Sequence, residues 1–389
     1  FKDVLVVKGK ENPTSDFDLL EIVEVTPALN DGLNAYKTFE DVTWRVGADV
    51  DVASGWLTEI QPEPFGFFPG DSRFPQGKHY DYTVDTLMGA VWGELDFALG
   101  EDVHVLAGLR AEAHEYDYST DVAPGINGRF NVPDDRTDNF DLLTPKLGLI
   151  WSVTEVTDLY ANYARGERAP QASDLYRLQI LQVAGQVKEE TLDSVEIGAR
   201  GNALNGRLVY DVAAYWMEKD NFFFRDSDGL NVPDGATEHK GVEMSAAFDL
   251  TPALSVSGSA SWSDQTYTFD RITGSGTETI RDGNEIDTAP EWLANVSLDW
   301  QATDAIKLSL KVDHVGEYFV DPANTTTYPG HTVLGARGAW ALSETAELFL
   351  IVRNLTDEKY ADRADLAFGN ERYFPGEPLN ATLGMRKTF

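Results

Sequence analysis

The sequence predicts an all-β fold, a large portion of an antiparallel transmembrane β-barrel with about 14 long strands. Three observations predict it. Apolar and polar residues alternate in segments of about 10–12 residues, such segments recur along the whole chain, and the connections between them alternate between short and long. Outer-membrane barrels have short periplasmic turns and long extracellular loops. A soluble β-sandwich also alternates, but its strands are usually only about 5–6 residues long.

The segment 42–52 illustrates the alternation. Every second residue is apolar, and the residues between them include Arg45, Asp49 and Asp51. At about 3.3 Å per residue and a tilt of about 45°, a strand of about 11 residues spans about 25 Å, the height of a lipid-facing band. A one-residue slip would turn the charges toward lipid, where a basic residue costs about 2–4 kcal/mol at mid-bilayer. The register of such a strand is therefore fixed.

The same pattern predicts the other elements in order. Strands are expected at 42–52, 83–97, 103–117, 141–152, 157–165, 192–201, 207–218, 239–249, 254–263, 292–301, 306–317, 332–341, 346–354 and 379–389, with a weaker pattern at 20–26. Short turns are expected at 98–102, 153–156, 202–206, 250–252, 302–305 and 342–345. Long loops are expected at 53–82, 118–140, 166–190, 219–238, 264–290, 317–331 and 355–377.

The ends of these segments support a membrane position. Several apolar faces carry tryptophan at an end, namely Trp262, Trp292, Trp300 and Trp340. Aromatic residues at strand ends are typical of the girdles at membrane interfaces. With loops and turns sorted in this way, the C-terminus at Phe389 is expected on the periplasmic side.

Composition excludes several functions. The 389 residues include no Cys, which rules out disulfides, Cys-based zinc sites and thiol nucleophiles. The net charge is −34, with 65 acidic and 31 basic residues, which argues against a nucleic-acid partner. No apolar run reaches the ~18 residues of a transmembrane helix. No signal peptide is visible and the chain begins with Phe1, which indicates a processed or partial chain.

Catalytic and metal signatures are weak. No GxSxG elbow occurs, and the six His residues show no metal-ligand spacing such as HExxH. His104 and His114 fall on a polar strand face, where they are expected to line the barrel lumen. The carboxylate-rich segments 226–229 and 281–287 lack the full spacing of a calcium loop, so solvated turns are expected there. We therefore expect no enzyme activity, no cofactor and no metal site.

Five segments resemble one family. They are LYANYARGERAPQASDLYRLQ (159–179), KEETLDSVEIGARG (188–201), ATEHKGVEMSAAF (236–248), VRNLTDEKYADRA (352–364) and the closing ERYFPGEPLNATLGMRKTF (371–389). In this order and spacing, the segments resemble those of TonB-dependent outer-membrane receptors, particularly siderophore receptors. The resemblance covers roughly residues 42–389.

The resemblance implies a larger protein. Receptors of this family have an N-terminal plug domain, a TonB box and a barrel of about 22 strands. Residues 1–389 therefore look like a partial barrel without the plug, and the missing parts are expected upstream of Phe1. Such a sheet is expected to be open, or to close in a non-native way, leaving strand edges exposed.

The resemblance also implies a function. It implies active import of a scarce ligand, most often a ferric siderophore or similar iron chelate, with TonB as the energy-transducing partner. It further implies the outer membrane of a Gram-negative bacterium, contact with outer-membrane lipid and lipopolysaccharide, and a monomer. Cobalamin, other metals and saccharides remain alternative cargoes.

Loop residues are the candidate ligand contacts. Cationic candidates, which would pair with anionic chelates, are Arg165, Arg168 and Arg225. Aromatic candidates, which would stack on flat chelating groups, are Tyr176, Phe222, Phe223, Phe224, Tyr318 and Phe319. The alternative for each is loop packing or membrane anchoring. Motifs shared by receptors for different cargoes are expected to build the barrel rather than to select the ligand.

Other functions remain open at this point. A passive porin-like channel of about 14–16 strands would be complete near this length. An outer-membrane enzyme on a barrel scaffold would need a Ser/His or Asp/His constellation at the rim, and a soluble β-adhesin would need no membrane. The sequence encoded upstream of Phe1 would separate the receptor from the passive channel.

Overall fold

A computed structural model describes most of the chain. The described residues are 3–7, 20–39, 42–64, 66, 70–180, 182–225, 231–272, 279–367 and 369–388, and side chains are described within these ranges from residue 42 onward, except at 225, 231 and 367. The predicted turn at 226–229 and the terminal Phe389 lie outside the described residues. Within the described part of the chain, no helix has the length and hydropathy needed to cross a membrane.

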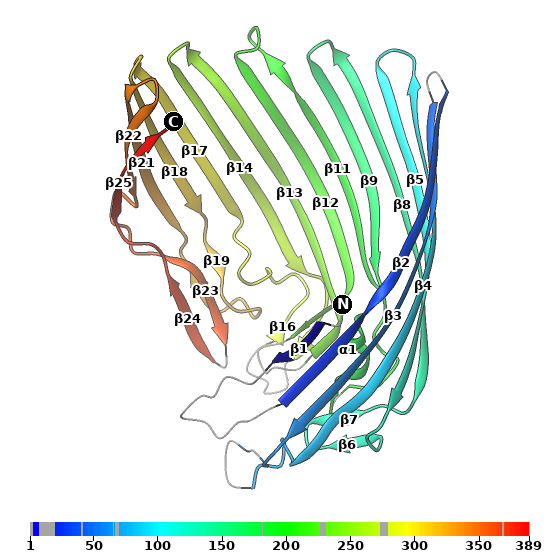
Figure 1. Cartoon of the computed structure of the whole chain (residues 1–389). Coiled ribbons are helices and arrows are strands. Elements are labelled where there is room, and N and C mark those ends of the chain that lie inside the picture. The colour runs from blue at the N-terminus through cyan, green and yellow to red at the C-terminus, as the bar shows by residue number, and fades with distance from the viewer. Residues whose placement is uncertain are drawn as a thin grey trace.

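The main feature is one antiparallel sheet of 16 strands in which each strand pairs with its neighbour in the chain order. Figure 1 shows it as a curved wall with short turns at one end and longer connections at the other. Its strands are β1 (Asp3–Val7), β2 (Leu20–Phe39), β3 (Val42–Gln61), β4 (Gly77–Leu99), β5 (Val103–Thr120), β8 (Arg136–Thr154), β9 (Thr157–Arg168), β11 (Glu190–Ala203), β12 (Leu208–Arg225), β13 (Asn231–Thr251), β14 (Leu254–Tyr267), β17 (Trp292–Thr303), β18 (Ile306–Val315), β21 (His331–Ser343), β22 (Ala346–Arg353) and β25 (Asn380–Lys387).

The prediction of 14 strands from residue 42 onward is confirmed by β3 to β25, and the weaker pattern at 20–26 is the start of the longer β2. The expected loops at 53–82 and 219–238 are wrong in extent. β3 continues to Gln61, and β12 continues to Arg225 before β13 starts at Asn231. The strands run beyond the lipid-facing band, where lipid no longer imposes an apolar outer face, so the hydrophobic alternation stops before the strand does.

The strand register separates an apolar outer face from a polar inner face. On β3 and β4, Ala48 lies opposite Val91 and Arg45 opposite Glu94, with an ion pair between the latter two. Outer-face residues such as Val91 (62% exposed) and Val296 (49% exposed) are left largely exposed by the described sheet. Apolar side chains so exposed along whole strands fit contact with lipid.

The long-loop end carries smaller elements on the concave side of the wall (Figure 1). We call one group the cap; it comprises β6 (Gly125–Asn127), β7 (Phe130–Val132), α1 (Ala172–Tyr176) and β10 (Leu178–Gln179). Its apolar residues, including Phe130, Leu175 and Tyr176, pack against Tyr80 and Tyr118 on the inner face of the main sheet. The cap therefore occupies part of the mouth.

A second group lies toward the C-terminus. β19 (Tyr318–Phe319) pairs with β20 (Thr327–Tyr328), and β23 (Ala361–Ala367) pairs with β24 (Asn370–Pro375). The two hairpins share a small core around Tyr318, Val320 and Ala364. A further short pair, β15 (Arg271–Ile272) and β16 (Thr279–Ile280), lies between β14 and β17.

The last described residues lie at the short-turn end, as Figure 1 shows. There the Thr388 N–H donates a hydrogen bond to the Thr345 carbonyl, 2.9 Å away, in the turn between β21 and β22. The sequence predicted this end for the C-terminus. In a bacterial barrel, short turns mark the periplasmic side.

Candidate functional site

Three charged residues form a chain on the inner face at the long-loop ends of β9, β11 and β12. Arg168 Nη2 lies 2.7 Å from Glu190 Oε2, and Lys219 Nζ lies 2.9 Å from Glu190 Oε1. The register places Arg168 opposite Glu190 and Lys219 opposite Leu192, on the inner face. One carboxylate thus pairs with two cations, and the charges of these three residues sum to +1. Arg168 remains half exposed, at 54%.

Aromatic rings continue this chain along β12. Lys219 Nζ lies 5.2 Å from the ring centroid of Phe222, which stacks on Phe224 with centroids 4.9 Å apart. Phe224 in turn meets Phe269 edge-on at 6.2 Å. Phe222 and Phe224 are both partly exposed. We call these six residues the interior strip: Arg168, Glu190, Lys219, Phe222, Phe224 and Phe269.

The interior strip unites three of the predicted ligand contacts: Arg168, Phe222 and Phe224. All three lie on strands, so their expected place in loops is wrong. Phe223 lies between the two stacked rings in the β12 sequence, and the Arg225 side chain lies outside the described part. Sequence reasoning missed Glu190, Lys219 and Phe269, because their proximity depends on strand register and on the path of the β14 end.

Arg165 has a different position from the one expected. It shares the outer face of β9 with Leu159 and Tyr163, and the register places it opposite Asp193. Its guanidinium lies 3.0 Å from Glu167 and 3.8 Å from Asp193. Because successive residues of a strand point to opposite faces, Arg165 points away from the lumen. It is therefore separated from the interior strip.

Tyr176 is a core residue of the cap. It has 0% exposure, stacks on Tyr118 at 4.3 Å and donates a hydrogen bond to Asp138 Oδ2 at 3.0 Å. Burial, together with the negative charge of Asp138, raises the pKa of its phenol. In this conformation Tyr176 has no free ring face for a ligand.

Tyr318 and Phe319 lie in β19, within the second group of hairpins rather than in an irregular loop. Tyr318 is 6% exposed, and its hydroxyl accepts a hydrogen bond from the Ala364 N–H at 2.9 Å. Phe319 is partly exposed, and its carbonyl accepts a hydrogen bond from the Thr288 N–H. Tyr318 therefore joins the hairpins together.

The Asn-Leu-Thr-Asp motif after β22 is a corner. Asn354, 1% exposed and with a φ of 48°, donates its amide to the carbonyls of Glu358 and Glu377 and accepts from the Glu358 N–H. The Tyr360 ring occupies the space that a Cβ on Gly376 would need. These contacts hold the segments before and after the β23–β24 hairpin together, which is a structural role.

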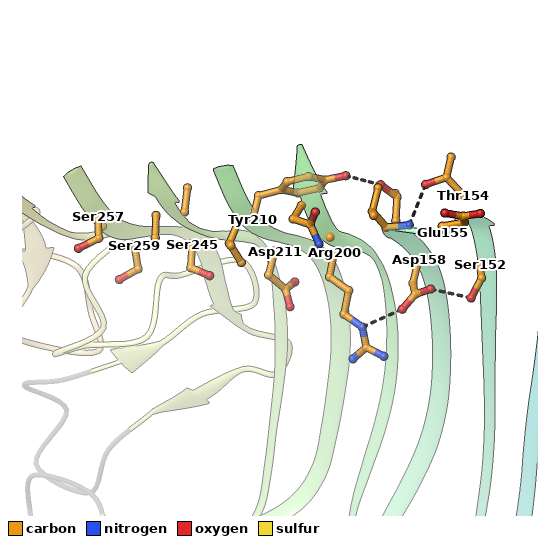
Figure 2. A pocket seen from close by; sticks show the side chains of 18 of the residues that line it. Ser152, Thr154, Glu155, Asp158, Arg200, Tyr210, Asp211, Ser245, Ser257 and Ser259 are labelled. Carbon is orange, nitrogen blue, oxygen red and sulfur yellow. Dashed lines mark hydrogen bonds and ion pairs between the residues drawn. The ribbon is translucent and has the colours of Figure 1, made fainter. Parts of the chain in front are cut away.

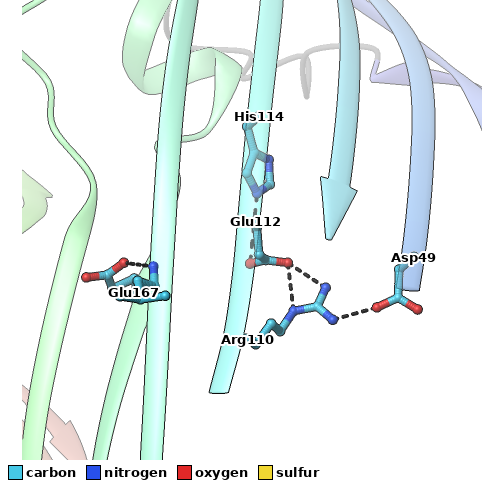
Figure 3. Close-up of polar contacts among 6 residues, drawn as sticks. Asp49, Arg110, Glu112, His114 and Glu167 are labelled. Carbon is cyan, nitrogen blue, oxygen red and sulfur yellow. Dashed lines mark hydrogen bonds and ion pairs between the residues drawn. The ribbon is translucent and has the colours of Figure 1, made fainter. Parts of the chain in front are cut away.

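On the inner face of β3 to β5, the charged side chains pair with one another. Figure 3 shows Arg110 between Asp49 and Glu112, with guanidinium–carboxylate distances of 2.5 Å to each. His114 follows on the same face of β5, with Nε2 4.0 Å from Glu112 Oε1. This confirms the expected lumen-lining position of His114. Since the Arg110 charge is already matched, this wall offers less attraction to an anion than the interior strip.

A wide recess lies against the inner wall near the short turns (Figure 2). Its volume is about 930 Å³. Six of the ten labelled side chains carry a hydroxyl group, four of them serines, and Arg200 Nε lies 3.6 Å from Asp158 Oδ2. Small hydroxyl groups and one ion pair provide little affinity for a flat anionic ligand. A ligand entering from the long-loop end also reaches the interior strip first.

The described residues contain no group of three or more His, Asp or Glu arranged to hold a metal ion. In the carboxylate-rich segment 281–287, Arg281 and Asp282 are exposed, as expected for a turn. Asn284 and Glu285 instead bond to Pro322 and Asn324, so solvation is only partial there. Burial raises the pKa of the Asp287 carboxyl, which accepts a hydrogen bond from Tyr267.

Comparison with known proteins identifies relatives of this architecture. The Escherichia coli K12 protein named catecholate siderophore receptor Fiu is 24% identical over 395 residues, covering 91% of this chain and 50% of the relative. The ferric-pyoverdine 358 receptor of Pseudomonas putida is 26% identical over 339 residues, covering 82% and 37%. The chain thus spans about half the length of its relatives, or less.

Solved structures share the fold. The ferric yersiniabactin uptake receptor FyuA from Yersinia pestis matches with a TM-score of 0.69 at 16% identity, over 96% of this chain and 55% of that one. The family profile "TonB dependent receptor-like, beta-barrel" matches residues 14–355, which is most of the sequence. The chain therefore belongs to the TonB-dependent receptor family and forms part of its β-barrel.

Proposed function

We propose that the protein carrying this chain is a receptor in the outer membrane of a Gram-negative bacterium, and that it imports a ferric siderophore or similar iron chelate with energy from TonB. The observation that carries the proposal is the interior strip at the mouth. The named cargoes of the relatives, a catecholate siderophore and ferric pyoverdine, support the same class of ligand.

The chemistry of the interior strip suits such a cargo. Iron chelates of this kind present flat chelating groups with anionic oxygens. Flat groups stack on Phe222 and Phe224, and an aromatic pair contributes about 0.5–1.5 kcal/mol beyond area burial. Anionic oxygens attract Arg168 and Lys219, which form ion pairs with the same carboxylate, that of Glu190.

An uptake assay tests the proposal. The full-length receptor is expressed in a siderophore-receptor-deficient strain, with or without TonB, and given radioactive ferric tris-catecholate or ferric tris-hydroxamate. We expect TonB-dependent uptake, and about a tenfold loss of apparent affinity in the double variant Phe222→Ala/Phe224→Ala, the equivalent of about 1.4 kcal/mol. Phe248→Ala is the matched control, because Phe248 shares the outer face of β13 with Val242.

The other outcomes are informative. Uptake that is equally fast without TonB would indicate a passive channel, the alternative function. Absence of uptake of every iron chelate, with the receptor present at the surface, would contradict the iron cargo. Unchanged affinity in the double phenylalanine variant would place ligand recognition away from the interior strip.

A further inference from the structure

A buried ionic group lies beneath the cap. Glu59 on β3 and His79 on β4 are 2% and 1% exposed. His79 Nδ1 lies 3.0 Å from Glu59 Oε1, and Arg177, just after α1, places Nη2 2.6 Å from Glu59 Oε2. Phe130 of β7 stacks on the His79 ring at 3.8 Å. The group therefore joins two strands of the wall to two elements of the cap.

The number of hydrogen-bond donors and acceptors sets how many protons Glu59 and His79 hold together. The second ring nitrogen of His79, Nε2, lies 2.7 Å from the Pro75 carbonyl oxygen, which accepts only. An ionised carboxylate also accepts only, whereas a neutral imidazole carries one N–H. Satisfying both partners therefore requires either a doubly protonated His79 or a protonated Glu59. In both cases the pair holds one more proton than an ionised Glu59 beside a neutral His79.

The charged and polar groups around Glu59 and His79 do not supply the missing hydrogen-bond donor. From the cap, Arg177 contacts Glu59 directly and Arg129 lies over Phe74, with its Cζ 5.4 Å from the ring centroid. From β4, Tyr80 donates its hydroxyl to the Leu178 carbonyl at 2.6 Å. Two cations close by in the sequence are paired elsewhere, since Lys78 bonds to Asp81 and Arg73 to Asp71. Among the described residues, the ion-pair partners of Glu59 are His79 and Arg177.

We propose that His79, Glu59 and Arg177 form a proton-dependent latch that holds the cap against the inner wall of the mouth. When the shared proton is lost, His79 keeps either its bond to Glu59 or its bond to Pro75, and the other buried acceptor is left unpaired. The closed cap binds the proton and the loosened cap does not. Low pH therefore favours the closed cap, and the closed population falls as pH rises.

Two variants separate a latch from simple packing. In Glu59→Gln, the amide N–H donates to His79 Nδ1, the amide oxygen still accepts from Arg177, and a neutral His79 donates to Pro75. The network is then complete without the extra proton, so the cap should stay closed at all pH values tested. In His79→Phe, residue 79 has no N–H for either acceptor at any pH, so the cap should be loose throughout.

The test is hydrogen–deuterium exchange of the full-length receptor in nanodiscs, read at peptides covering 125–132 and 172–180. After correction for intrinsic exchange, the wild type should exchange about tenfold faster at about pH 8.5 than at about pH 5.5, the effect of one unpaired buried acceptor. His331→Gln is the control and should retain this step, because His331 contacts Tyr328 in the second group of hairpins.

The results that overturn the latch are distinct. The latch is contradicted if the exchange rate of the wild-type cap does not change with pH. It is also contradicted if the same change with pH persists in Glu59→Gln. If the cap of the Glu59→Gln variant is loose at every pH, the Glu59 carboxylate has a packing role only. The readout uses no ligand, so failure of the latch leaves the import proposal untouched, and the reverse also holds.

Discussion

Gly241 in the Thr-x-x-x-Gly-x-Glu segment shows why one residue type is required at a motif position. A Cβ at Gly241 would collide with the backbone carbonyl oxygen of Trp262 and lie 2.7 Å from the Tyr215 hydroxyl. The backbone of β14 is held by its hydrogen bonds to β13, so it cannot move away without breaking them. The glycine therefore lets β13 and β14 approach while Tyr215 crosses the inner face.

Gly241→Ala should lower the free energy of unfolding by about 1–3 kcal/mol, the usual cost of overpacking. Gly89→Ala is the matched control, because a Cβ at Gly89 meets no atom within 4 Å. Urea unfolding of the receptor in phospholipid vesicles measures both. Equal stabilities of the two variants would show that the strands adjust to the added carbon.

Asn354 combines two local requirements at the corner after β22. Asn354→Ala removes three partly buried side-chain hydrogen bonds and also places alanine at a φ of 48°. We expect a loss of about 1–3 kcal/mol from the unpaired groups. Asn354→Gly should be less destabilising by about 1 kcal/mol, since glycine adopts this conformation without strain. Identical unfolding midpoints for the two variants would exclude a contribution from backbone strain.

At the scale of the element, each strand is specified by the contrast between its faces. On β17, Val296 lies on the outer face midway between Trp292 and Trp300, and its neighbour Asn295 lies on the inner face. Val296→Arg should cost about 2–4 kcal/mol, because the guanidinium would enter the bilayer midplane. Asn295→Arg should change the free energy of unfolding by less than about 1 kcal/mol. Similar losses in both variants would contradict the face assignment.

The sequence predicted the elements better than the site. Alternation identified the 14 strands of the main sheet from β3 to β25, because lipid imposes an apolar outer face, but it did not identify the short strands within the long loops. It failed to predict the strand ends, since Glu59 and Arg225 lie on extensions above the lipid band where that constraint is absent. It also grouped Arg165 with Arg168, although the two-residue period puts these two side chains on opposite faces of β9.

At the scale of the whole molecule, the described sheet has two free edges. β1 pairs only with β2, and β25 pairs only with β22, among the strands that the structure describes. β1 has 5 residues and β25 has 8, and their backbone groups along the outer side of each edge need partners. In lipid or detergent, water cannot supply these hydrogen bonds, so a free edge attracts another strand.

The 389-residue chain, refolded alone in detergent, should therefore associate through these edges. Size-exclusion chromatography with light scattering should show oligomers whose mass rises with concentration. The full-length receptor in the same detergent is the control, and it should be a monomer if its remaining residues pair with both edges. A concentration-independent monomer of the isolated chain would instead mean that its two edges pair with each other in a smaller, non-native barrel. Conductance in planar bilayers would then test whether that barrel is open, since the cap fills only part of one end.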